Sequence, residues 1–321
     1  RAGSRRAFGL LVRGAVLLVV GTLALVALRM MRWGEFWGAL RTSDVRWLLL
    51  AAAANLGVIG LVTWRWMALL KPLARRLRWR DAFAAVTVGF AVSTVVPARA
   101  GEVARMGLLN RRSGLPRVQL LGSIALDQLM NAAGLVVALA LLPWLGDVPA
   151  WMRPGVIAAL LVFAAAVVAL VVLRPGAHAP AAPADPAARP GVLASIRQGL
   201  SAARSPRALG GSFAASVAAW ALEVVVLQLA LRAFGIVLPL AQNIVVLVAV
   251  NLMLAVPVAP ANLGTLEVGA TLGLLGFGIA KEKALAFAIC YHALQALPVA
   301  AIGFLFAARE GVTGSAGEWG A

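Results

Sequence analysis

Apolar runs of about twenty residues recur along this chain and limit what it can fold into. The runs at 47–70 and 209–233 are examples, and each contains few charged residues. A helix needs about 20 apolar residues to span the hydrocarbon core of a bilayer. Of the 321 residues, 62% are hydrophobic and 13% are charged, whereas a soluble domain is roughly half apolar and a quarter charged. We therefore expect an all-α multi-pass membrane protein. A transmembrane barrel is not expected, because the runs are continuous rather than alternating.

The net charge of +17 does not indicate nucleic-acid binding, because the arginines flank the apolar runs as the positive-inside rule expects. The single cysteine, Cys290, excludes a disulfide within the chain and a cysteine-based metal cluster. The chain contains no nucleophile elbow, phosphate loop or zinc-binding His-Glu-x-x-His motif. We therefore expect no enzyme activity, no metal and no cofactor.

Charge between the runs predicts the topology. A first helix at 10–28 resembles a signal peptide, but no clean cleavage site follows it, so we favour a retained helix. Residues 71–80 contain only basic charges, which predicts a cytoplasmic loop and cytoplasmic N- and C-termini. Arg65, near the end of its run, is interpreted as snorkelling to the interface. Residues 281–283 are interpreted as a nearly neutral outer turn.

The stretch Pro97-Ala-Arg-Ala-Gly-Glu102, with Arg105 shortly after it, interrupts an apolar region. A full crossing before this stretch would put Arg111 and Arg112 outside. A re-entrant hairpin over 82–112 returns them to the cytoplasm, and we prefer it. Non-helical backbone at membrane depth is tolerated where it is buried in protein or lines a wet cavity.

A second break, Pro257 to Gly264 with Glu267 after it, follows the same order of elements. The predicted topology makes the two halves inverted repeats, in which paired broken helices point to a transport site. The predicted hinges are Pro97, Gly101, Pro257, Pro260 and Gly264. The predicted organisation is an N-terminal helix and interfacial segment (1–46), a first repeat (47–173) with the hairpin 82–112 and an extra helix (154–173), a cytoplasmic linker (174–208), a second repeat (209–308) with the hairpin 240–277, and a cytoplasmic tail (309–321).

The sequence motifs at both breaks resemble those of a known protein family. Pro97-x-Arg-x-Gly-Glu-x-x-Arg105, and Pro257 with the later Gly264-x-x-Glu267, are similar to the flippase-like membrane module of lysylphosphatidylglycerol synthases and its stand-alone relatives. The resemblance implies movement or handling of a lipid in a bacterial or archaeal cytoplasmic (inner) membrane. Relatives are associated with aminoacylated phosphatidylglycerol, polyprenyl-phosphate-linked sugars and hopanoid pathways. In the synthases a soluble aminoacyl-transferase domain follows, and because this chain ends at Ala321 we expect no lipid aminoacylation.

The charged and polar residues at membrane depth are the candidate substrate-binding residues. The full set is Arg99, Arg105, Glu102, Asp127, Glu267, His292, Asn262 and Glu223. Charge inside a bilayer is expensive and usually functional, and arginine suits phosphate oxygens. Arg99 and Arg105 are therefore assigned to a lipid phosphate, with an ion pair to Glu102 as the alternative. The three other carboxylates are either structural partners or proton-coupling groups, and His292 is either a titrating group or a core histidine.

Our leading hypothesis is a lipid translocase (flippase-like) for an anionic, phosphate-bearing lipid such as a phosphatidylglycerol-like or polyprenyl-phosphate-linked lipid. The alternative is a non-transporting subunit that presents a lipid to a partner enzyme of lipid synthesis, with the basic linker as its docking surface. A lipid-modifying transferase with Asp127 or Glu267 as general base is weaker, because no donor site is present. The sequence leaves open whether the protein forms a homo-oligomer. No nucleic-acid partner is expected.

Overall fold

The computed structural model describes residues 33–74, 76–95, 100–145, 199–254 and 262–309, with scattered positions from 154 to 168. Every regular element within these residues is a helix. The helices are α2 (Trp33–Arg41), α3 (Val45–Leu70), α4 (Trp79–Val95), α5 (Ala100–Ser113), α6 (Arg117–Leu145), the short 3-10 helix η2 (Leu200–Arg204), α9 (Pro206–Ala233), α10 (Leu240–Leu254), α11 (Thr265–Leu275) and α12 (Lys281–Arg309). The predicted first helix at 10–28, the linker before residue 199 and the tail from 310 lie outside the described residues.

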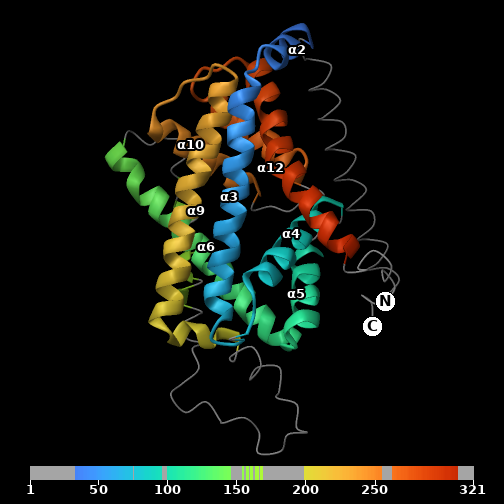
Figure 1. The fold of residues 1–321 in the computed structure, drawn as a ribbon. Helices are drawn as coiled ribbons and strands as arrows, with labels where there is room; N and C mark the ends of the chain where they lie inside the picture. The colour runs from blue at the N-terminus through green and yellow to red at the C-terminus, as the bar shows by residue number, and fades with distance from the viewer. Residues whose placement is uncertain are drawn as a thin grey trace, which may run out of the picture.

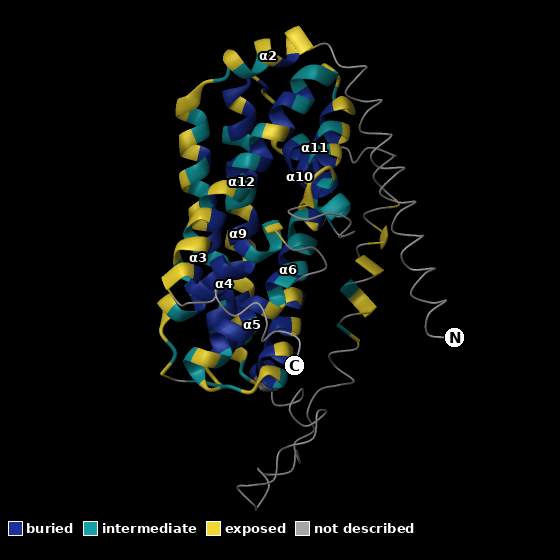
Figure 2. Ribbon diagram, turned by 90° about the vertical axis from the view of Figure 1, so that its right-hand side faces the viewer, coloured by how far each residue is buried: buried dark blue, intermediate teal, exposed yellow. Residues whose placement is uncertain are grey.

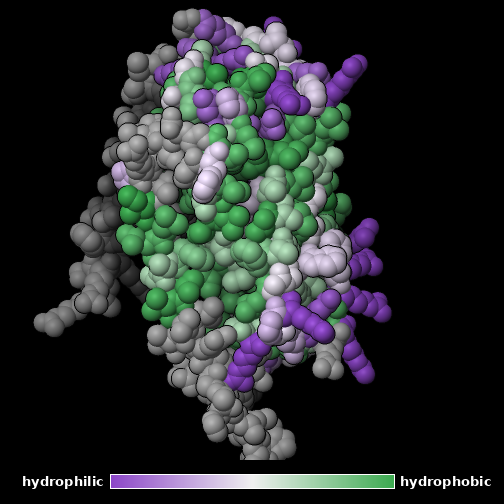
Figure 3. All heavy atoms as spheres, turned by 90° about the vertical axis from the view of Figure 1, so that its left-hand side faces the viewer, coloured by the Kyte–Doolittle hydropathy of each residue, from purple (hydrophilic) through white to green (hydrophobic). Residues whose placement is uncertain are grey.

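Four of the described helices, α3, α6, α9 and α12, are long and apolar enough to cross a membrane. Large apolar side chains lie exposed on their outer faces, for example Leu49 on α3 and Leu297 on α12, each 66% exposed. Figure 3 shows a broad hydrophobic band around one side of the bundle, with hydrophilic side chains gathered at its two ends. Buried residues lie toward the inside of the bundle, where the helices face one another (Figure 2). The protein is therefore an all-α, multi-pass integral membrane protein, as the sequence predicts.

The helices α3 and α9 run side by side in opposite directions and form the centre of the bundle (Figure 1). Both begin with a side-chain cap. The Asp44 carboxylate accepts a hydrogen bond from the Arg46 amide at 2.9 Å, and Ser205 Oγ accepts one from the Ala208 amide at 3.2 Å. Such caps satisfy amide groups that a helix start leaves without a partner. Pro206 follows Ser205 at the first helical position, where its missing N–H costs nothing.

The hairpin predicted at 82–112 is present as α4 and α5. An ion pair of 2.7 Å joins Asp81 at the start of α4 to Arg112 at the end of α5, so both ends of the hairpin lie on the same side of the bundle. The two helices pack so closely that Gly89 of α4 and Gly101 of α5 have no room for a side chain. A Cβ added at Gly101 would overlap the carbonyl oxygen of Gly89 and the hydroxyl of Ser93. Because α4 and α5 are antiparallel, Arg111 and Arg112 at the end of α5 lie on the same side as the start of α4, as the charge pattern predicts.

The hairpin predicted at 240–277 is present as α10 and α11. Glycines again face the partner helix: Gly269 lies against Val250, and Gly273 lies against Val246. Because the second pair runs backward along α10, the helices are antiparallel. In Figures 1 and 2, α4 and α5 lie toward one end of the bundle, and α10 and α11 lie toward the other. With α3 and α9 also opposed, this is the arrangement of inverted repeats.

Each half is closed by a long helix that packs on the opposite half. Gly134 of α6 lies against Ser216 of α9, and Gly303 of α12 lies against the Thr87 carbonyl of α4. Pro298 lies inside α12, and a proline cannot donate to the carbonyl four residues earlier. That carbonyl belongs to Leu294.

The freed backbone near Pro298 is satisfied by α3. The buried Asn55 amide donates to the carbonyls of Leu294 at 3.5 Å and Gln295 at 3.1 Å. Residues 281–283 are predicted to form a turn, and this prediction is wrong, because they form the first turn of helix α12.

Candidate functional site

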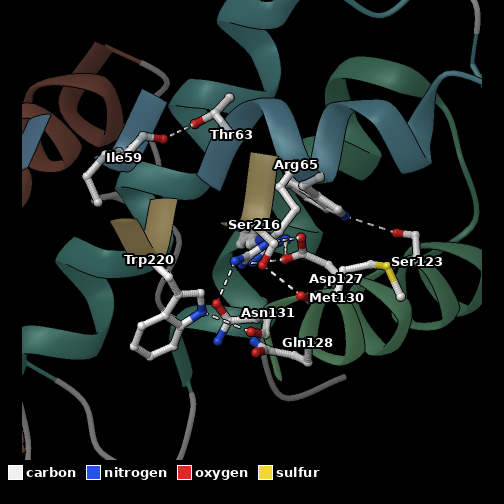
Figure 4. A network of polar contacts seen from close by, with 12 residues as sticks. Ile59, Thr63, Arg65, Ser123, Asp127, Gln128, Met130, Asn131, Ser216 and Trp220 are labelled. Atoms are coloured by element: carbon white, nitrogen blue, oxygen red, sulfur yellow. Dashed lines mark hydrogen bonds and ion pairs between the residues drawn. The ribbon is translucent and has the colours of Figure 1, made fainter. Parts of the chain in front are cut away.

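The interpretation of Arg65 as a snorkelling residue is wrong. Its side chain is 5% exposed, because α3 at this position is covered by α6 rather than by lipid. Its Nε donates to Asp127 Oδ1 at 2.8 Å, and its Nη1 donates to the Asn131 side chain at 2.6 Å. Figure 4 shows Arg65 reaching from α3 toward Asp127 and Asn131 on α6. A charge this far from solvent needs such partners.

Asp127 is fully buried and lies at the centre of a cluster of charged side chains, which we call the polar cluster. Its second oxygen accepts a hydrogen bond from Arg105 Nη2 at 2.9 Å, so one carboxylate joins two arginines from α3 and α5. The cluster also contains Glu102, whose carboxylate lies 3.4 Å from Arg105 and accepts from the Gln128 amide at 3.1 Å. With two arginines and two carboxylates, this group of four carries no formal net charge.

Beyond its ion pairs, Arg105 stacks on an aromatic ring and has one hydrogen-bond donor without a partner in the described residues. Its guanidinium lies 3.7 Å from the centre of the Trp66 ring, a stacking geometry that suits arginine. The Trp66 indole in turn donates to Ser123 at 3.2 Å. The Arg105 Nε is buried and has no hydrogen-bond partner within the described residues. An unsatisfied buried donor is costly, so this atom is a candidate contact for a ligand.

A cavity of about 330 Å³ lies between the two halves. The first half contributes Arg65, Arg105 and Glu102 to its lining, and the start of α5 at Gly101 also faces it. The second half contributes these polar residues: Glu223, Asn251, Tyr291 and Gln295. Ligand pockets commonly measure about 300–1,000 Å³. The size therefore suits a headgroup rather than a whole lipid.

Glu223 is the carboxylate of the second wall. It accepts one hydrogen bond from the Gln295 amide at 3.2 Å, and the same amide contacts the Tyr291 hydroxyl at 2.8 Å. No arginine or lysine pairs with Glu223 among the described residues, unlike Asp127. The two walls of the cavity thus differ, with both arginines on the first half and a carboxylate bound to neutral groups on the second.

Glu267 and His292 form a separate pair that does not line the cavity. His292 Nδ1 lies 2.7 Å from Glu267 Oε1, and Glu267 Oε2 accepts the Gly264 amide at 2.8 Å. Glu267 therefore caps α11 and links it to α12. The pair mirrors Arg105 and Asp127, which link α5 to α6 with the basic and acidic side chains in the opposite order.

The remaining predicted residues lie at the breaks. Gly264 has φ of 84° and Asn262 has φ of 58°, both in the left-handed region that favours glycine and asparagine. The Asn262 carbonyl accepts from the Thr265 hydroxyl at 2.8 Å, and Asn262 does not line the cavity. Asn251, which was not among the predicted site residues, does line the cavity, and its amide donates to the Leu247 carbonyl within α10. The four remaining residues, Arg99, Pro97, Pro257 and Pro260, lie outside the described residues.

The sequence reasoning missed Arg65, Gln295 and Tyr291 as parts of the site. A signal for Arg65 was present, because a buried Asp127 requires a cation and Arg65 lies within a spanning run. No such signal marked Gln295, whose partner Glu223 lies on another helix, or Tyr291, which contacts Gln295 one turn away on α12. Within the part of the chain that the structure describes, no group of three His, Cys, Asp or Glu side chains could hold a metal ion.

Residues 10–303 match the family described as the lysylphosphatidylglycerol synthase TM region. The chain belongs to this family. A UPF0104 membrane protein of Methanothermobacter thermautotrophicus is 25% identical over 162 residues, and the alignment covers 48% of each chain. The chain thus matches about half the length of this curated relative. The family match confirms the resemblance based on the two breaks, and it connects the protein with the membrane part of lipid-modifying proteins.

Proposed function

We propose that this protein translocates a lipid whose phosphate-bearing headgroup enters the cavity while its acyl chains stay in the bilayer. The main observation in favour is the buried cluster of Arg65, Arg105 and Asp127 beside a headgroup-sized cavity between opposed hairpins. Charges at this depth are expensive, and those that proteins retain are usually functional. A purely structural core could be built from apolar side chains at no loss of stability.

In this proposal the phosphate competes with Asp127 for the arginines. Arg105 offers the unused Nε donor, and the α5 N-terminus at Gly101 adds the positive end of a helix dipole. Because Asp127 joins α3, α5 and α6, its partial release on phosphate binding would loosen the contacts between these helices. Headgroup binding and opening of the cavity are thereby coupled. Asp127, Glu102 and Glu223 keep the site near neutrality as the headgroup enters and leaves.

The proposed orientation follows the distribution of charge. Basic side chains outnumber acidic ones where α3 and α5 end and α6 and α9 begin, and they include Lys71, Arg76, Arg78, Arg111, Arg117 and Arg207. The positive-inside rule assigns this end to the cytoplasm. We therefore propose a bacterial or archaeal cytoplasmic membrane, with both chain termini in the cytoplasm. Reaction of Arg76→Cys with a membrane-impermeant thiol reagent, in a Cys290→Ser background, tests the orientation, because labelling of intact cells would contradict it.

Translocation is tested in liposomes that contain the purified protein and fluorescent phosphatidylglycerol, with quencher added outside. Wild-type protein should speed leaflet exchange above the rate of empty vesicles. Arg105→Gln should slow that exchange about tenfold or more, as expected from loss of a charged hydrogen bond. Arg112→Gln is the matched control, since it breaks the other arginine–aspartate pair of α5, outside the cavity.

Two results would count against the proposal. The first is exchange no faster than in empty vesicles for each anionic lipid tested. The second is Arg105→Gln exchanging lipid as fast as Arg112→Gln. Tight binding of a lipid without exchange would instead support the alternative, a subunit that presents a lipid to a partner enzyme.

A further inference from the structure

A second, larger hollow lies on the outside of the bundle between α3 and α9, and we call it the lateral groove. Its volume is about 890 Å³. Small residues form much of its lining, including Gly57, Gly60 and Ala68 on α3 and Gly211 on α9. A Cβ added at Gly60 would meet no atom within 4 Å, which shows that the space above it is open.

The lateral groove is distinct from the central cavity. On α3 the groove is lined by positions 57, 61, 64 and 68, whereas the cavity is lined by positions 58, 62 and 65. These sets lie on neighbouring faces of the helix. On α9 the groove uses the first turns, near Arg207 and Gly211, and the cavity uses residues around Glu223. No residue lines both.

Two cations lie at one end of the groove. Lys71 follows the last turn of α3, and Arg207 lies in the first turn of α9. Neither pairs with an acidic side chain in the described ranges. The start of α9 adds the positive end of a 28-residue helix at the same place.

Two tryptophans mark this end as the membrane–water interface. Trp64 is 59% exposed and Trp79 is 43% exposed, and both line the groove. Tryptophan is enriched at the level of lipid headgroups. The rest of the lining is mostly apolar or small, and includes Leu61 and Met67 on α3 and Ala208 on α9. The helices α3 and α9 lie side by side along the bundle (Figure 1).

We propose that the lateral groove binds one anionic phospholipid from the leaflet at the α3–α4 end of the bundle. Its phosphate lies between Lys71 and Arg207, and an acyl chain lies over Gly60 and Gly211. Two unpaired cations above an apolar channel match a molecule with a negative headgroup and a hydrocarbon tail. A soluble anion would leave the channel empty. The site does not depend on translocation through the central cavity.

Native mass spectrometry of the purified protein tests this proposal, with dioleoyl phosphatidylglycerol and dioleoyl phosphatidylcholine as paired probes. Wild-type protein should bind phosphatidylglycerol in preference. The double variant Lys71→Gln/Arg207→Gln should reduce that preference roughly 25-fold, the value for two cations near a membrane surface. Both changes are on exposed side chains, so the fold should be kept.

Neighbouring glycines on α9 provide a matched pair. A side chain at Gly211 enters the groove, whereas Gly210 does not line it and has open space around it. Gly211→Leu should therefore lose bound phosphatidylglycerol, and Gly210→Leu should retain it. The proposal is overturned if the double variant keeps the wild-type preference, or if Gly211→Leu binds like Gly210→Leu. It is also overturned if Arg105→Gln removes the preference, because the lipid would then lie in the central cavity.

Discussion

Replacing Asp127 with asparagine tests whether the buried cluster behaves as an ion-pair network. The change leaves the shape of the side chain intact and removes its charge. Both carboxylate oxygens bind guanidinium groups, from Arg65 at 2.8 Å and from Arg105 at 2.9 Å. An asparagine NH₂ would place donors against donors on one side. Removing one partner of a buried ion pair costs about 3–5 kcal/mol, and we expect Asp127→Asn to reach the upper part of this range because two arginines lose their partner.

The assay uses the only cysteine in the sequence. Cys290 is partly buried in α12, so a thiol-reactive fluorescent dye reports unfolding as the protein is heated in detergent. A loss of this size should lower the melting temperature on the order of 10 °C. Asp44→Asn is the control with the same chemical change. Asp44 is an exposed cap of α3, and asparagine caps helices as well as aspartate does, so its melting temperature should stay unchanged.

A double-mutant cycle separates charge balance from packing. Asp127→Asn leaves the cluster with one excess positive charge, and Arg105→Gln leaves it with one excess negative charge. Their combination restores neutrality, so the double variant should be more stable than the sum of the single losses predicts. Residues in one ion-pair network couple by about 0.5–3 kcal/mol. If the losses add to within about 0.3 kcal/mol, Arg105 and Asp127 do not stabilise one another and the reasoning fails.

Three further substitutions test a close helix–helix contact, a helix cap and the hydrogen bonds near the proline of α12. Gly101→Ala should destabilise the protein by about 1–3 kcal/mol, because the new methyl overlaps α4, whereas Gly210→Ala has open space and should stabilise it by up to about 1 kcal/mol in the same melting assay. Glu267→Ala should cost about 1–3 kcal/mol through the lost cap of α11 and its link to α12. It should nevertheless change the rate of lipid exchange less than the loss of a cavity arginine, and an equal loss would place it in the transport site. Asn55→Leu should cost about 1–3 kcal/mol by leaving carbonyls of α12 without donors. That cost should shrink in a Pro298→Ala background, where the backbone regains its own N–H, and an unchanged cost would contradict this account.

The first arginine-bearing break illustrates how far sequence reasoning reached. Charge distribution alone required that the chain turn back before Arg111, and the ion pair between Asp81 and Arg112 shows that it does. The ends of α4 and α5 could be predicted because glycine, proline and charge act locally. The sequence left the partner of Arg105 open between Glu102 and the carboxylates of other helices. Glu102 is near in sequence, but the shorter contact is to Asp127 on the next helix.

Arg65 illustrates the opposite case. An arginine five residues before a helix end can reach the interface or turn inward, and its own sequence neighbourhood is the same in either case. Only the packing of α6 against α3 decides that it faces Asp127. Likewise, Glu223 and Glu267 look alike along the chain, yet the first lines the cavity and the second caps a helix.

The sequence by itself determined that this is a helical membrane protein and where its two helical hairpins lie. Apolar length, glycine and proline at the breaks, and arginine in the loops are one-dimensional signals, because membrane insertion and helix ends respond to local composition. The tertiary structure alone decided which charges meet. Asp127, Arg65 and Arg105 come from three helices, and a low-dielectric interior makes each of them depend on the positions of the other two.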